Sequence, residues 1–124
     1  MRTLLVLVIA GCVGLSACTP ARIPYNWGDY SSSLYTLKKE PSDEKLQAHK
    51  QVLLQIIQES GGKALKVPPG IYAEYGYLLV REGKTEEGFK YLDLEAQTFP
   101  ESKVFVERVK AQAIPSTDQK EQKP

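Results

Sequence analysis

Residues 69–102 read PGIYAEYGYLLVREGKTEEGFKYLDLEAQTFPES. Proline is tolerated in the first turn of a helix, so a helix is expected from about Pro69 to Glu82, with Gly83 as its stop. Thr85 is expected to cap a second helix that runs to about Thr98. Pro100 then ends it, because proline cannot continue a helix. The run therefore predicts two antiparallel helices joined by a tight turn.

Small and large residues in this run are placed for close helix packing. Gly76 and Gly88 fall one on each helix, and they predict that the two backbones approach closely at this point. The spacing resembles one tetratricopeptide repeat, a 34-residue helical hairpin. A generic helical hairpin is the alternative, because Glu95 stands where the repeat pattern has a small residue. The places that agree are Tyr72, Tyr75, Gly76, Leu79, Gly88, Leu92 and Pro100.

A second, degenerate hairpin is predicted upstream. An aromatic-rich helix is expected over about 29–39, ended by Pro41. Ser42 is a good N-cap for a further helix, with apolar residues along one face. That helix is expected to end at about Glu59, because Gly61-Gly62 follow. Trp27 is interpreted as a core residue of the first helix.

The chain is therefore predicted to be all-α, with five helices in tetratricopeptide-like pairs and a closing helix. The last helix is expected from about Glu101 to Ala113, as a cap on the stack. Residues 25–113 form the predicted domain. Residues 114–124 contain almost no apolar side chain and are expected to be disordered.

The N-terminus predicts a lipid anchor. An apolar run over residues 4–15, too short to span a bilayer, follows Arg2 and precedes Leu15-Ser16-Ala17-Cys18. This arrangement resembles a bacterial lipoprotein signal peptide with its lipobox. The resemblance implies cleavage after residue 17, a lipid on Cys18 and, because Thr19 follows, sorting to the outer membrane. An ordinary secretory signal is the alternative.

Cleavage after residue 17 would determine the length and charge of the mature chain. It would leave 107 residues, with 15 basic against 15 acidic residues and no free thiol. A neutral balance does not favour nucleic acid as a partner. Residues 18–24 would form a tether whose last six residues reach roughly 20 Å. The helical domain is thus expected close to the membrane, facing the periplasm.

The region 18–110 also resembles an uncharacterised family of small Gram-negative lipoproteins. The resemblance rests on the lipobox, on Tyr25-x-Trp27-Gly28-x-Tyr30, on Pro68-Pro69-Gly70 and on the hairpin that closes at Pro100. It implies a gene neighbourhood with a CsgG-like lipoprotein, and hence a shared envelope assembly. It implies no activity and no functional residues.

No residue set in the sequence predicts catalysis, a metal or a cofactor. His49, the only histidine, falls on an apolar helix face and is interpreted as a hydrogen-bonded core residue. No serine lies in a nucleophile-elbow motif. Tyr77, Val80 and Ala73 take places that line the concave face in repeats of this kind, and they are the candidate partner contacts.

The function expected from the sequence is therefore non-enzymatic. The chain is expected to act as an outer-membrane lipoprotein that binds or assembles another envelope protein, with a CsgG-like lipoprotein as the implied partner. Two alternatives stay open at this point. One is a pilotin-like escort of an outer-membrane pore, and the other is a protein that binds or acts on the cell wall.

Overall fold

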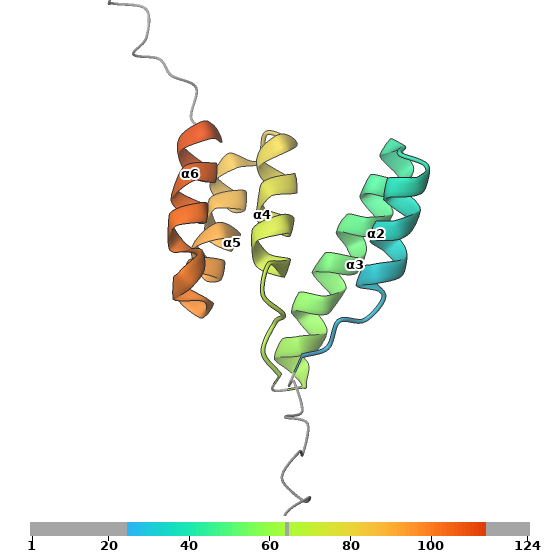
Figure 1. Cartoon of the computed structure of the whole chain (residues 1–124), viewed down its shortest axis with the longest axis horizontal. Helices are drawn as coiled ribbons and strands as arrows, with labels where there is room; N and C mark the ends of the chain where they lie inside the picture. The colour runs from blue at the N-terminus through green and yellow to red at the C-terminus, as the bar shows by residue number, and fades with distance from the viewer. Residues whose placement is uncertain (1–24, 64, 114–124) are drawn as a thin grey trace, which may run out of the picture.

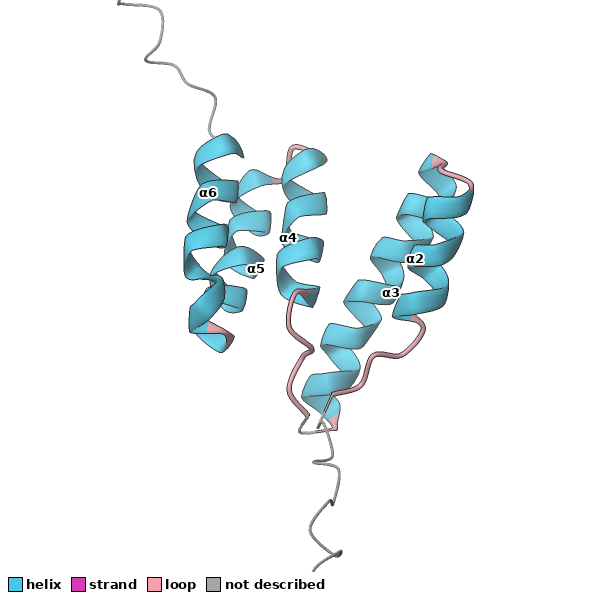
Figure 2. Ribbon diagram, in the orientation of Figure 1, coloured by secondary structure: helices cyan, strands magenta, loops and turns pink. Residues whose placement is uncertain are grey.

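The structure is a computed structural model that describes residues 25–63 and 65–113. The all-α prediction is confirmed, since the described residues hold five α-helices, one 3₁₀ turn and no strand (Figure 2). The predicted signal peptide, tether and tail lie outside the described residues. The elements are α2 (Tyr30–Lys39), α3 (Asp43–Gly62), α4 (Ile71–Arg81), α5 (Thr85–Thr98), the 3₁₀ turn η2 (Pro100–Ser102) and α6 (Lys103–Ala113).

The helices stack in chain order as two groups. Helices α2 and α3 form an antiparallel hairpin, and α4, α5 and α6 lie side by side as a second group (Figure 1). Contacts between α3 and α4 join the groups, which diverge from the connection at residues 65–70. This order is consistent with tetratricopeptide-like pairs and a closing helix.

Helix ends follow the sequence expectations in part. The Ser42 side chain caps α3 as predicted, since its Oγ accepts a bond from the Lys45 amide at 3.2 Å. The predicted stop at Gly61-Gly62 is wrong, because α3 continues through both glycines. Each glycine disfavours a helix by only about 1 kcal/mol, which buried residues earlier in α3 outweigh. Thr85 is also not a cap: it is the first residue of α5, and Lys84 precedes it without a side-chain bond.

Two apolar clusters hold the stack together. The larger one joins α3 to α4, and the smaller one joins α4, α5 and α6. Burial of such side chains stabilises the fold by about 25 cal/mol per Å² of apolar surface. The buried residues of the larger cluster are Leu53, Ile56, Val67, Ile71, Tyr75, Leu78 and Leu79. Those of the smaller one are Ala73, Leu92 and Val106.

The close approach of α4 and α5 is confirmed at Gly76 and Gly88. A Cβ on Gly76 would lie 2.7 Å from the Gly88 carbonyl oxygen, and one on Gly88 would lie 2.5 Å from the Gly76 oxygen. Both distances are below van der Waals contact with backbone atoms. Only residues without a side chain fit at this crossing, so the glycine pair fixes the spacing of the hairpin.

Glu95 departs from the repeat pattern because it satisfies the start of α4. It is only 2% exposed, and its Oε1 accepts a bond from the Gly70 amide at 2.8 Å. Gly70 has a left-handed φ of 89°, and α4 has no side-chain cap of its own. Among the described residues, the second oxygen, Oε2, has no hydrogen-bond partner. Glu95 thus supplies from α5 the acceptor that the helix start needs.

Burial raises the pKa of Glu95, because desolvation of the carboxylate outweighs the bonds from nearby amides. Because the pKa is raised in the folded state, the contribution of Glu95 to stability is fully present below its ordinary pKa of 4.5 and is lost as pH rises.

Glu95→Gln should therefore be more stable than wild type at neutral pH, and this difference should shrink toward pH 4.5. Urea unfolding at both pH values measures it. Glu86→Gln, exposed on the same helix, controls for the charge; a constant difference would contradict the assignment.

Candidate functional site

A hollow lined by aromatic rings lies between the starts of α2, α4 and α6. We call this hollow, with a volume of about 450 Å³, the aromatic hollow. Trp27, Tyr77 and Phe105 remain 41%, 47% and 56% exposed, although their rings are large and apolar. Its lining residues are Trp27, Tyr30, Pro69, Gly70, Ala73, Glu74, Tyr77 and Phe105.

A second hollow of about 320 Å³ continues along α4 toward its C-terminal end. We call it the basic hollow, because Lys38 and Arg81 line it beside the apolar side chains Leu34, Leu37 and Leu78. Glu74 and Tyr77 line both hollows, so the two form one groove. The groove runs over α4 and is walled by residues of α2, α3 and α6.

The predicted contact residues divide between groove and core. Tyr77 and Ala73 line the aromatic hollow, with Ala73 buried at its floor. Val80 lines neither of these hollows; it packs against the smaller apolar cluster, and its Cγ2 faces Gly88. The role of these three residues as partner contacts stays a prediction, for which the groove geometry favours Tyr77 and Ala73.

Trp27 is placed differently from the sequence interpretation. It is not a core residue but lies 41% exposed at the edge of the groove, with its ring centroid 5.6 Å from that of Tyr30. Phe105 was not anticipated as a groove residue at all. Its position depends on how α6 returns beside α4, which local sequence does not specify.

A polar network lies where the two hollows meet, since Tyr30 lines one, His49 the other and Glu74 both. Its centre is His49, which is 1% exposed, as the prediction of a hydrogen-bonded core histidine required. Ring atom Nδ1 lies 2.8 Å from Ser33 Oγ, and Nε2 lies 3.0 Å from Glu74 Oε1. The Tyr30 hydroxyl donates to Glu74 Oε2 at 2.9 Å. The network therefore ties α2, α3 and α4 together.

Glu74 sets the direction of two bonds in this network. A carboxylate only accepts, so His49 Nε2–H and the Tyr30 hydroxyl both donate to Glu74. The pKa of Tyr30 is raised to about 12, chiefly by burial and further by the hydrogen bond to Glu74 and the negative charge of Glu74. The phenol thus stays protonated and keeps its bond throughout the physiological pH range.

Ser33, His49 and Glu74 are the residue types of a nucleophilic triad, but the backbone around Ser33 favours a structural role. Ser33 lies inside α2, where its amide donates to the Asp29 carbonyl at 3.0 Å. Acyl transfer needs free amide donors for the developing oxyanion. The Ser33 hydroxyl also lies 3.0 Å from the Tyr30 carbonyl oxygen. The geometry is that of a hydrogen-bond network that joins helices.

Removing one hydrogen bond of this network should lower the stability of the protein moderately. Tyr30→Phe deletes the hydroxyl that donates to Glu74, which should lower the free energy of unfolding by about 1 kcal/mol. Urea denaturation at neutral pH measures it. Tyr35→Phe, on the exposed side of α2, is the matched control and should leave stability unchanged. Equal stability of wild type and Tyr30→Phe would show that the bond contributes nothing.

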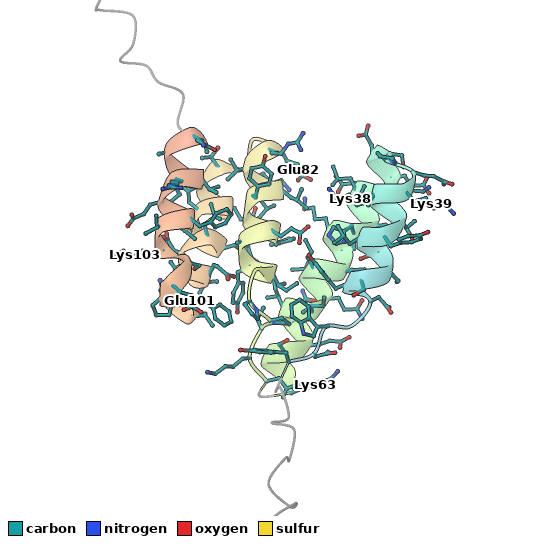
Figure 3. All side chains as sticks on the ribbon, viewed as in Figure 1. Lys38, Lys39, Lys63, Glu82, Glu101 and Lys103 are labelled. Carbon is teal, nitrogen blue, oxygen red and sulfur yellow. The ribbon has the colours of Figure 1, made fainter. Side chains whose placement is uncertain are left out.

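Glu82, the residue after α4, adds a second link across the groups. It accepts bonds from Lys50 and from Gln47, both on α3, the latter at 3.1 Å. These bonds lower the pKa of Glu82 below its ordinary value. Figure 3 shows Glu82 at the same end of the molecule as Lys38 and Lys39. The groups are thus connected at two places, by Glu74 within α4 and by Glu82 after it.

The described residues lack a membrane-spanning helix and a metal-binding cluster. Within residues 25–63 and 65–113, no helix has the length and hydropathy needed to cross a membrane. The same residues contain no cluster of three histidine, cysteine, aspartate or glutamate side chains placed to hold a metal ion.

The fold and groove define a small all-α protein of stacked helical hairpins. The chain belongs to the family described as Domain of unknown function (DUF4810), which it matches over residues 24–109. No curated protein and no solved structure matches it. The family match agrees with the expectation of an uncharacterised family, and it adds no activity.

Proposed function

We propose that this chain is a non-enzymatic, lipid-anchored protein of the outer membrane that docks another envelope protein in its groove. The observation that carries the proposal is the exposure of three aromatic rings in one concave place. Trp27, Tyr77 and Phe105 come from three separate segments, yet all line the aromatic hollow. Aromatic side chains are enriched in the buried centres of protein interfaces.

The shape of this surface favours a protein partner over the membrane itself. A bilayer surface is broad, whereas the rings lie within a groove walled by helices. Ala73 at the floor is small, so a partner side chain can approach α4 closely. The lipobox at Leu15–Cys18 and the short tether keep the domain near the membrane, where envelope proteins are concentrated. A CsgG-like lipoprotein is the first partner to test, on the resemblance stated above.

The test is co-purification from membranes solubilised in mild detergent. The wild-type protein should bring down one envelope protein in a constant ratio, and Tyr77→Ala should lose most of it. Tyr35→Ala removes a more exposed tyrosine outside the groove and should retain the partner. Circular dichroism confirms that both variants are folded. Recovery of the wild-type protein alone would remove the proposal.

A further inference from the structure

Two cations without an ion-pair partner in the described part of the chain line the basic hollow, near the C-terminal ends of α2 and α4. Lys38 lies in the last turn of α2 and Arg81 in the last turn of α4, and both line the basic hollow. Among the described side chains, neither has a carboxylate oxygen within 4.0 Å. Both remain exposed to solvent. Their charge is therefore available to a ligand.

Two acids near this end make hydrogen bonds within the protein. Among the described residues, Glu74 is the only carboxylate that lines either hollow, and its two oxygens accept one bond each, from Tyr30 and from His49. Glu82 is bonded to Lys50 and Gln47 of α3. Neither carboxylate lies within 4.0 Å of a nitrogen of Lys38 or Arg81.

The helix dipoles offset the charge of these two side chains only in part. Each helix C-terminus carries about half a negative charge, while each of the two side chains carries a full positive one. Each cation therefore exceeds the charge of the helix end beside it. Between the cations lie apolar side chains, among them Leu34, Leu37 and Leu78. The surface combines an apolar floor with a cationic rim.

We propose that the groove binds an acidic protein segment, which places an aromatic or aliphatic side chain in the aromatic hollow and carboxylates against Lys38 and Arg81. The inference rests on the proposed function and names the chemistry of its partner. Apolar contact in the aromatic hollow supplies affinity. The charges of Lys38 and Arg81 set the orientation of the bound segment and exclude basic segments. Binding should therefore weaken as salt concentration rises.

A peptide selection on the mature lipoprotein in detergent micelles tests this. A random displayed library is the probe, and binding of the enriched peptides is measured by fluorescence polarisation. Enriched sequences should combine an aromatic or aliphatic residue with at least one acid.

The double variant Lys38→Glu/Arg81→Glu should weaken the binding of these peptides by about tenfold or more, because two attractions become repulsions. The control Lys39→Glu/Arg108→Glu makes the same change in net charge at exposed residues outside the groove. It should weaken peptide binding by no more than about twofold.

Three outcomes overturn the inference: no enrichment, enriched peptides without acids, or equal weakening by the two double variants. None of these outcomes removes the proposed function, because co-purification of an envelope partner with Tyr77 as its contact is measured separately. Thermal unfolding of both double variants shows that the charge changes leave the fold intact.

Discussion

Gly88→Ala should destabilise the protein by about 3 kcal/mol, a large part of the 5–15 kcal/mol typical of a domain this size. The added Cβ would lie 2.5 Å from the Gly76 carbonyl oxygen, 2.6 Å from Val80 Cγ2 and 3.0 Å from the Val80 amide nitrogen. Two of these three atoms belong to the backbone, so no side-chain rotation relieves the overlap. Helices α4 and α5 must separate, and the smaller apolar cluster loses its packing.

Two further variants make this result specific. Gly88→Ala/Val80→Ala removes the side-chain overlap but keeps the backbone one, so it should not restore stability. Gly61→Ala adds the same methyl group to α3, where nothing lies within 4 Å. It should stabilise the protein by about 0.5 kcal/mol through helix propensity. Urea unfolding measures all three, and a Gly88→Ala protein as stable as wild type would refute the close crossing.

Cys18→Ser should remove the protein from the outer-membrane fraction completely. In the proposed lipoprotein, the thioether bond would form on the Cys18 sulfur, and serine offers no thiol for it. Stable attachment needs more than one acyl chain, and the proposal places all of them on residue 18. Cys18 itself lies outside the described residues, and this expectation comes from the sequence.

Metabolic labelling with radioactive palmitate, followed by membrane fractionation, measures the effect. The wild-type protein should incorporate label and sediment with the outer membrane, whereas Cys18→Ser should do neither. Cys12→Ser is the matched control, because residue 12 belongs to the proposed signal peptide and its replacement should change nothing. A labelled Cys18→Ser protein in the outer membrane would show that the anchor is elsewhere.

Local features were predictable from the sequence because their causes are local. The hairpin at 69–102 follows from a glycine pair, a turn at Gly83 and a stop at Pro100, all within one 34-residue unit. The cap at Ser42 follows from one side chain and an amide three residues later. The errors at Gly61-Gly62 and Thr85 concern helix ends: α3 continues through two glycines, and α5 begins at Thr85 with no side-chain cap.

The groove could not be predicted, because it depends on residues far apart in the chain. Trp27, Tyr77 and Phe105 meet only once α2, α4 and α6 are stacked. The partners of His49 lie 16 and 25 residues away, and their identity depends on how α2 and α4 pack around α3. Glu95 looked like a flaw in the repeat pattern. Its role at the start of α4 is visible only in three dimensions.

The central claim is that a membrane-anchored helical domain holds a partner in this groove. Site-specific photocrosslinking in intact cells tests it most directly, with the photoreactive residue in place of Tyr77 or, as control, of Tyr35. A single discrete adduct with an envelope protein is expected from position 77 and none from position 35, which is more exposed but lies outside the groove. Adducts of equal yield from both positions, or none from position 77, would contradict the account.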